Sequence, residues 1–317
     1  MPSWILPTVA FMLGLIILSG GAEALIRGAL RMARLWKISP IVIGLTIVAF
    51  GTSAPEMGVA LSAALSGQPD ITMGNILGSN IANTGLILGL GALLTPLTVR
   101  QRMLRTEIPL LIVVSMALWA FATMGHLGRL AGLILLITFT AYCVTLYRHS
   151  REEPYTLQVE FDKSLNRKSS FWLDLVLVIA GLAGLVIGSK SLVWGAENIA
   201  VYLGIPELIV GLILTAIGTS LPELATTVAA ARKGQTDLIL GNVIGSNLSN
   251  LCAVLGVTAC VTPIDINPDL LHRDFPVMMA LSLVLLPVMR IGMKVTRWEG
   301  AALLLSYSVY VISLVVF

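Results

Sequence analysis

Two glutamates, Glu56 and Glu223, interrupt stretches that are otherwise apolar, and each follows the same run of residues. One run is Gly51-Thr52-Ser53-Ala54-Pro55-Glu56 and the other is Gly218-Thr219-Ser220-Leu221-Pro222-Glu223. An ionised carboxylate inside a lipid bilayer costs at least about 2–3 kcal/mol unless it is compensated. No Lys or Arg lies at comparable depth in the neighbouring apolar stretches. We therefore expect the two carboxylates to bind a cation.

Oxygen-bearing groups recur around the first acid at helical spacing. Thr52 and Ser53 precede Glu56 by four and three residues, which predicts both hydroxyls on the carboxylate's face of a helix. Pro55 has no N–H to give to the carbonyl of Gly51, so the turn opens and exposes backbone oxygens. A simple structural kink is the alternative for one such proline. Two prolines, each directly before a glutamate in a repeated motif, favour a site.

The second acid has the same neighbours in Thr219, Ser220 and Pro222. Carboxylate, hydroxyl and freed carbonyl oxygens together form the ligand set of a hard cation such as Ca²⁺.

A second pair of motifs follows the glutamates, Gly74-Asn75-Ile76-Leu77-Gly78-Ser79-Asn80 and Gly241-Asn242-Val243-Ile244-Gly245-Ser246-Asn247. Small residues four apart predict close helix packing at the four glycines. Asn75 and Asn242 fit a ligand and an interhelical hydrogen bond equally well, and both interpretations stay open.

Two Ser/Asn pairs, Ser79 with Asn83 and Ser246 with Asn250, are also spaced four apart, so each pair projects to one helix face. We expect these side chains to be ligands; interhelical hydrogen bonding is the alternative. Asp70 and Asp237 stand just before a predicted helix, and N-capping explains them without an ion.

The elements that must position these residues are membrane helices. Of the 317 residues, 56% are hydrophobic and only 12% are charged, whereas about a quarter of a typical soluble domain is charged. Apolar runs of about twenty residues predict helices rather than barrel strands. The predicted spans are 4–34, 40–66, 71–95, 107–124, 128–147, 171–200, 205–231, 238–262, 274–290 and 298–316.

The motifs recur at a constant offset of 167 residues. The fold class is therefore an all-α polytopic membrane protein, with ten transmembrane helices arranged as two five-helix repeats at 1–147 and 171–317. A hydrophilic linker, 148–170, joins the repeats. An odd number of crossings makes the second repeat insert upside down relative to the first, so the repeats are inverted.

Loop charge tests this topology independently. With the N-terminus outside, 17 of the 20 Lys and Arg residues fall in cytoplasmic segments, and only Arg129, Lys190 and Arg273 fall on the other side. This pattern predicts that both termini lie outside and that the linker lies inside.

Other function classes find little support. Histidines occur only at segment ends and the three cysteines lack the spacing of a zinc site, so an enzyme such as an intramembrane hydrolase lacks its catalytic groups. An ion channel is possible, but repeated acid half-sites suit occlusion better than a continuous pore. We expect no cofactor, no nucleic acid partner and no obligate protein partner, with a monomer as the default state. The lipid bilayer is the expected environment.

The paired motifs closely resemble the two alpha-repeats of the sodium/calcium exchanger family, within the calcium/cation antiporter superfamily, and the resemblance covers essentially the whole chain. It implies a prokaryotic ten-helix antiporter of the cytoplasmic membrane that exchanges Na⁺ for Ca²⁺. Its first and sixth helices would be long, tilted and mobile. Calcium/proton exchangers of the superfamily typically carry Asn at the positions of Ser53 and Ser220.

The resemblance also implies a set of ion ligands. Glu56 and Glu223 would coordinate the central ions, and the sites would be completed by the side chains of Thr52, Ser53, Thr219, Ser220, Ser79, Asn83, Ser246 and Asn250, with backbone carbonyls near Ala49 and Ala216.

One position departs from some members of the family, which carry Asp where this chain has Asn250. The site then offers two carboxylates, which one Ca²⁺ or two Na⁺ would neutralise. A third Na⁺ would leave an excess of one charge, so the usual three-for-one exchange does not follow from these residues. A calcium or other divalent cation/proton antiporter that uses the same glutamates is the alternative function.

Overall fold

A computed structural model describes residues 4–36, 38–150, 170–203 and 218–316 of the chain. The first repeat begins with one long helix, α1, and continues through a second span broken into short pieces. Its elements are α1 (Ile5–Trp36), α2 (Pro40–Ile43), η1 (Gly44–Val48), α3 (Ala49–Thr52), α4 (Ala54–Leu65), α5 (Pro69–Ala82), η2 (Asn83–Ile87), α6 (Leu88–Leu94), β1 (Leu97–Thr98), η3 (Met103–Glu107), α7 (Ile108–Ala122), β2 (His126–Leu127) and α8 (Arg129–Ser150).

The described elements of the second repeat follow a similar order. They are α9 (Phe171–Tyr202), α11 (Leu221–Arg232), α12 (Thr236–Leu248), η6 (Ser249–Val254), α13 (Leu255–Val261), β3 (Ile264–Asp265), α14 (Pro268–His272), α15 (Asp274–Arg290), η7 (Ile291–Met293), β4 (Lys294–Val295) and α16 (Arg297–Val316). The segments η1, η2, η3 and η6 are π-helical turns, and η7 is a 3₁₀ turn.

Most of the predicted spans appear as continuous helical segments. Seven described segments are long and apolar enough to cross a membrane, and the bent pair Pro40–Thr52 and Ala54–Leu65 makes eight. The other two predicted spans fall on α16, a 20-residue helix, and on α11, which is preceded by residues outside the described part of the chain. The prediction of an all-helical polytopic fold is confirmed.

Short strand pairs show that the two repeats are inverted. β1 pairs antiparallel with β4, and β2 pairs antiparallel with β3. In the repeat, β1 corresponds to β3, because Leu97 and Ile264 differ by the offset of 167 residues. β1 and β2 lie at opposite ends of α7, so β3, which pairs with β2, lies at the opposite end of the molecule from β1. Equivalent elements on opposite sides are what an inverted repeat requires.

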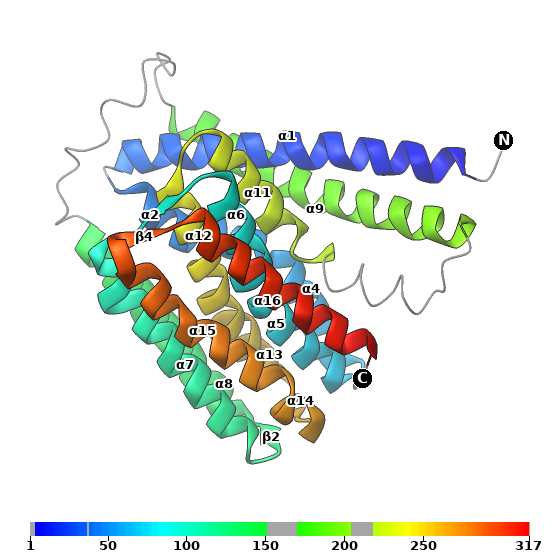
Figure 1. The fold of residues 1–317 in the computed structure, drawn as a ribbon, viewed down its shortest axis with the longest axis vertical. Coiled ribbons are helices and arrows are strands. Elements are labelled where there is room, and N and C mark those ends of the chain that lie inside the picture. Colours follow the sequence, from blue (N-terminus) through cyan, green and yellow to red (C-terminus); the bar gives the residue numbers. More distant parts are fainter. Residues whose placement is uncertain (1–3, 37, 151–169, 204–217, 317) are drawn as a thin grey trace.

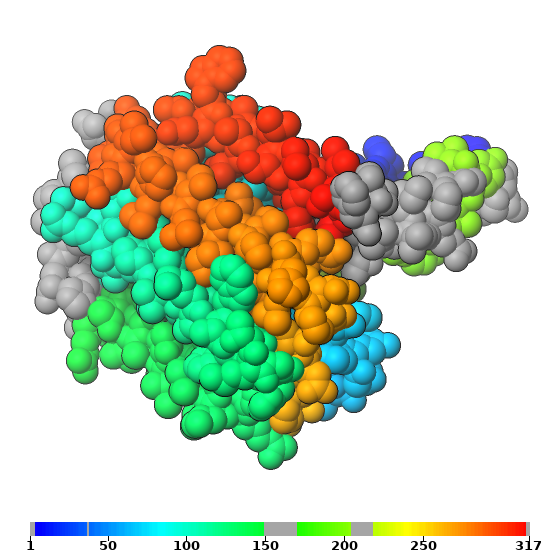
Figure 2. Space-filling view, turned by 60° about the horizontal axis from the view of Figure 1, so that its bottom comes forward, coloured from blue at the N-terminus to red at the C-terminus, as the bar shows by residue number. Residues whose placement is uncertain are grey.

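The outer wall of the body consists of α7, α8, α14, α15 and α16 (Figures 1 and 2). Inside it, α5–η2–α6 and α12–η6–α13 are the most deeply buried segments; every residue of the most apolar 18-residue window of Thr236–Val261 is buried. These two segments carry the Gly-Asn-x-x-Gly-Ser-Asn motifs. Outward-facing side chains such as Ile137, Leu305 and Val309 are large and apolar, as lipid contact demands.

The helices α1 and α9 form a separate antiparallel pair that crosses the body and projects beyond it (Figures 1 and 2). Glycines spaced seven apart line the contact on both helices: Gly14, Gly21 and Gly28 on α1, and Gly181, Gly188 and Gly195 on α9. A Cβ atom at Gly21 would lie 2.7 Å from the backbone nitrogen of Leu185. The glycines therefore let the two backbones pack in direct contact.

This packing predicts opposite effects at two adjacent glycines. Gly21→Ala should lower the melting temperature in detergent, because the new methyl group overpacks the helix contact at a cost of about 1–3 kcal/mol. Gly20→Ala is the matched control: Gly20 is exposed, no described atom lies within 4 Å of the place its Cβ would take, and alanine favours the helix. Equal melting temperatures for the two variants would contradict the close contact.

Candidate cation site between the repeats

The helix that carries Glu56 is broken directly before the acid. α3 ends at Thr52, Ser53 adopts φ −78° and ψ 6°, and α4 starts at Ala54 after a bend of 43°. Pro55 in the first turn of α4 cannot continue the hydrogen-bond pattern of α3, which explains the break. Glu56 therefore lies in the first turn of a helix, where unpaired N–H groups favour negative charge.

The second repeat has the same local structure. Ser220 adopts φ −87° and ψ 3°, α11 begins at Leu221, and Glu223 lies in its first turn. Pro222 occupies the place of Pro55. Both glutamates are thus presented by helix N-termini that point toward the interior of the protein.

The two carboxylates meet in the core. Glu56 and Glu223 are both fully buried, and they lie close enough for their charges to repel each other. Neither oxygen of Glu56 makes a hydrogen bond of regular geometry in the described structure, and the same holds for Oε2 of Glu223. Two buried carboxylates with free oxygens form a strongly cation-attracting centre.

Hydroxyls of the first repeat contact the carboxylate of the second repeat. The Ser53 hydroxyl donates to Oε1 of Glu223 at 3.5 Å, and the Thr52 hydroxyl also lies near this carboxylate. Helical spacing predicts Thr52 and Ser53 beside Glu56, but neither hydroxyl forms a hydrogen bond with Glu56, and Ser53 donates to Glu223 instead. The hydroxyl near Glu56 is that of Ser79.

The carbonyl of Ala49 lies among these groups. Thr52 Oγ1 donates to it at 3.2 Å and Ser246 Oγ donates to it at 3.4 Å, so both repeats reach the same backbone oxygen. Thr52 Oγ1 also lies 3.3 Å from Oδ1 of Asn242. The repeat-equivalent residue Asn75 instead donates from Nδ2 to the backbone oxygen of Glu56 at 3.2 Å.

Glycines bring the walls of the site together. A Cβ atom at Gly245 would lie 2.7 Å from Cα of Leu45 and 2.7 Å from Cβ of Ala49. Gly241 is equally close to the backbone of the second span, so the packing predicted for these two glycines is confirmed. The repeat-equivalent partners of Gly74 and Gly78 fall at 208–216, outside the described residues.

Two asparagines stand at π-helical turns. Asn83 begins η2, and Asn250 lies in the first turn of η6; the carbonyls of both accept the N–H of the residue five positions later. Both side chains are fully buried and their amide groups have no hydrogen-bond partner in the described structure. Such turns interrupt α-helical pairing and often mark functional sites. They expose polar groups that a regular helix would place differently, and sequence spacing did not predict them.

Most of the predicted ligands therefore lie in one buried region. Ser220 and Ser246 are buried, and Thr219 is half-buried. Ala216 lies outside the described residues. In the described part of the chain, no three His, Cys, Asp or Glu side chains are grouped so that they could hold a metal ion together, so this centre has two carboxylates and neutral oxygens.

The other buried acids of the described structure differ from this pair, because each has a basic partner. Arg102 pairs with Glu107 at 3.2 Å, and Arg31 pairs with Asp174 at 3.5 Å. Arg273 pairs with Asp274 at 3.1 Å.

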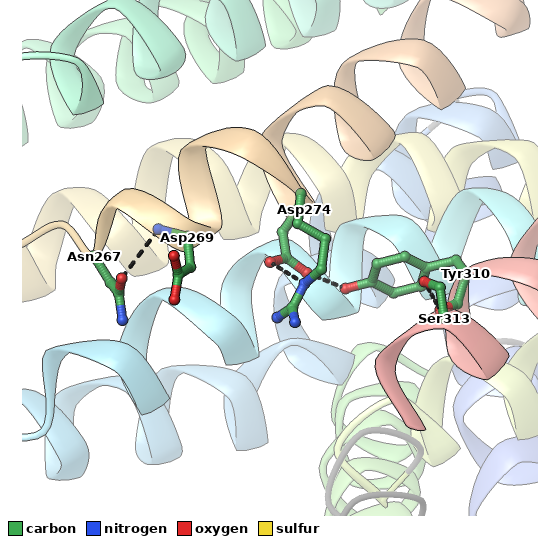
Figure 3. A network of polar contacts seen from close by, with 6 residues as sticks. Asn267, Asp269, Asp274, Tyr310 and Ser313 are labelled. Carbon is green, nitrogen blue, oxygen red and sulfur yellow. Dashed lines mark hydrogen bonds and ion pairs between the residues drawn. The ribbon is translucent and has the colours of Figure 1, made fainter. Parts of the chain in front are cut away.

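Figure 3 shows that Asp274 also contacts Tyr310, and this contact joins the start of α15 to α16. Nearby, the backbone N–H of Asp269 donates to the side chain of Asn267 at 3.0 Å.

Among the described residues, no Lys or Arg forms an ion pair with Glu56 or Glu223. Among the buried acids of the described residues, only Glu56 and Glu223 have no basic partner in these ion pairs.

The N-capping predicted for Asp70 and Asp237 is wrong. The N-cap residues are Gln68 and Gln235, and the aspartates lie in the first turns of their helices. There Asp237 forms an ion pair with Arg100, and Asp70 accepts a hydrogen bond at 3.3 Å from Asn267, which is the repeat equivalent of Arg100. Both aspartates act as contacts between the repeats.

Ser189 of α9 is a contact that sequence analysis did not identify. Its hydroxyl donates to the carbonyl of Gly218 at 2.8 Å, immediately before Thr219. Its only signal in the sequence is a polar side chain next to Gly188 within an apolar run. On the first repeat, Leu182 of α9 lies over Gly51, where a Cβ atom would meet its side chain at 2.6 Å. α9 thus touches the Gly-Thr-Ser motifs of both repeats.

Comparison with known proteins agrees with this architecture. The chain is 39% identical over 289 residues to inner membrane protein YrbG of Escherichia coli, covering 88% of this chain and 87% of that protein. It is 33% identical over 338 residues to sodium/calcium exchanger MaX1 of Methanosarcina acetivorans, covering 96% and 97% of the two chains.

The solved structure of the sodium-calcium exchanger NCX_Mj soaked with Na⁺ and Sr²⁺ superposes with a TM-score of 0.84 at 33% sequence identity, covering 98% of this chain and 99% of that one. Residues 6–148 and 173–316 each match the family described as sodium/calcium exchanger protein. The chain belongs to the sodium/calcium exchanger family.

Proposed function

We propose that this protein is a secondary active antiporter that exchanges Na⁺ for Ca²⁺ across the membrane. The observation that carries the proposal is the pair Glu56 and Glu223, which are fully buried without a basic partner among the described residues and are surrounded by neutral oxygens. Carboxylate, hydroxyl, amide and carbonyl oxygens suit hard cations. The names of MaX1 and NCX_Mj, both sodium/calcium exchangers, support the same ions.

The ligands we assign come from both repeats. Glu56, Glu223 and the carbonyl of Ala49 form the centre, with the hydroxyls of Thr52, Ser53 and Ser79 around it. Thr219, Ser220, Asn83, Ser246 and Asn250 complete the set, and Ala216 is assigned by its repeat equivalence to Ala49. Because each repeat supplies one carboxylate, neither repeat forms the site alone.

The exchange mechanism follows from the need to neutralise the two carboxylates. One Ca²⁺ or two Na⁺ neutralise the two carboxylates, so the ions compete for the same oxygens. A doubly negative site is costly to enclose in an apolar interior, whereas a neutralised one is not. Alternating access then proceeds only with ions bound, and this requirement suppresses uncoupled leak.

We assign the protein to the cytoplasmic membrane of a prokaryote, in line with the name of its relative YrbG, an inner membrane protein. The 17 to 3 distribution of Lys and Arg favours both termini outside and the linker 148–170 inside. The five-helix repeats then extend over 1–147 and 171–317.

The direct experiment is uptake of radiolabelled calcium into proteoliposomes under an imposed Na⁺ gradient. Uptake should require the Na⁺ gradient and should be unaffected by a pH gradient alone. Uptake driven by a pH gradient and indifferent to Na⁺ would instead establish the calcium/proton alternative.

Replacement of either central glutamate should abolish exchange. Glu56→Gln and Glu223→Gln each remove one of the two charges that a bound cation neutralises, so we expect at least a hundredfold loss of Na⁺-driven Ca²⁺ uptake, equivalent to about 2.7 kcal/mol. Expression and melting temperature should be retained, because a neutral amide is cheaper to bury. Glu299→Gln, outside the site, is the control. Normal flux in either site variant would refute the assignment.

A third carboxylate should change the ion requirement. Asn250→Asp adds one negative charge beside Glu56 and Glu223, so more positive charge is needed to neutralise the site. We expect tighter Ca²⁺ binding and a Hill coefficient for Na⁺ competition that rises by about one. Both are measurable by radiolabelled Ca²⁺ binding in detergent. Asn198→Asp on α9 is the control, and an equal response there would argue against Asn250 as a ligand.

A further inference from the structure

The contact between Ser189 and Gly218 joins the α1–α9 pair to the candidate cation site. Pro222 has no N–H, so the carbonyl of Gly218 lacks the donor that a continuous helix would supply four residues later. Ser189 Oγ donates to this carbonyl at 2.8 Å, and the serine side chain is buried, with 6% exposed. The hydroxyl of α9 thus replaces a missing helical hydrogen bond directly next to Thr219 and Ser220.

The first repeat has no such contact. The residue of α1 equivalent to Ser189 is Ala22, at the offset of 167, and alanine has no hydroxyl to give to Gly51. In an alternating-access carrier with inverted repeats, the two conformations are approximately related by exchanging the roles of the repeats. A bond available to only one repeat therefore stabilises only one of the two conformations.

We infer that Ser189 is a positioning residue that holds α9 against the Gly-Thr-Ser turn of the second repeat and sets the balance between the two access states. The inference rests on the proposed antiport function. α1 and α9 pack on each other along their length, so they move together as a pair. Displacement of this pair along the body must break the bond to Gly218.

A second contact ties the same pair to the other end of α11. Lys233, just after α11, forms an ion pair with Glu23 of α1 at 2.7 Å, and Glu23 also pairs with Arg27. The equivalents of Glu23 and Lys233 in the repeat are Lys190 and Ser66, which cannot form this pair. Both tethers thus favour the conformation described here. The ion pair is partly exposed, so its contribution is the smaller one.

The test measures apparent Ca²⁺ affinity from each side of the membrane, in right-side-out and inverted vesicles. For a two-state carrier, a shift of the equilibrium raises the apparent affinity on one side and lowers it on the other, so their ratio changes by the same factor as the equilibrium. Ser189→Ala should change this ratio about fivefold, the factor for one net hydrogen bond. Ser189→Thr retains the hydroxyl and should restore the ratio, and Glu23→Gln should change it in the same direction by less.

Ser191→Ala is the matched control. Ser191 Oγ donates to the carbonyl of Ala10 at 2.9 Å, which is a bond of similar length inside the α1–α9 pair that moves with it. Its loss should leave the ratio unchanged. A wild-type ratio in Ser189→Ala, or an equal change in Ser191→Ala, would overturn the inference. Na⁺-driven Ca²⁺ uptake by the unmodified protein keeps the two questions separate: its absence would refute the antiport function itself, whereas an unchanged ratio in Ser189→Ala with uptake intact would refute only the role of Ser189.

Discussion

Two carboxylates buried without a basic partner constrain the rest of this structure. Glu56 and Glu223 are enclosed in the core, near enough to repel each other, while the other buried acids of the described residues pair with arginines. Such a centre is tolerable only if cations and neutral oxygens compensate it. In the site we propose, those oxygens come from the helix breaks at Ser53 and Ser220, from the π-helical turns at Asn83 and Asn250, and from the hydroxyls of the motifs. The apolar exterior then keeps water away from them.

Each of the two inverted repeats contacts polar groups of the other at this centre. Hydroxyls of the first repeat reach Glu223 of the second, and Ser246 of the second repeat reaches the carbonyl of Ala49 in the first. Glycines at 241 and 245 allow the backbones to approach closely enough for these contacts. In the proposed site, a bound ion is therefore held by both repeats at once. Movement of one repeat relative to the other changes the ligand set, and this dependence couples ion binding to conformation in the proposed exchange cycle.

Several repeat-equivalent residues make different contacts in the two repeats. Asn75 contacts the backbone of its own repeat, whereas Asn242 contacts Thr52 across the repeat interface. Ser189 and Glu23 contact the two ends of α11, and their repeat equivalents Ala22 and Lys190 cannot make the same bonds. A perfectly symmetric chain would give its two access states equal energy. These substitutions between the repeats are the means by which this chain can favour one state.

The sequence by itself determined the helical membrane fold, the two repeats and the identity of the central acids. These features depend on composition, on an offset of 167 residues and on local chemistry, which act over one or two helical turns. Thr52 and Ser53 show where that reasoning ends. Helical spacing placed them beside Glu56, yet the break at Ser53 directs the Ser53 hydroxyl to Glu223, 170 residues away.

Only the tertiary structure decided which repeat supplies each oxygen to each acid, that Asn83 and Asn250 stand at π-helical turns, and that Ser189 binds the carbonyl freed by Pro222. These features arise from contacts between helices far apart in the chain, and a period of 3.6 residues along one helix carries no information about its neighbour.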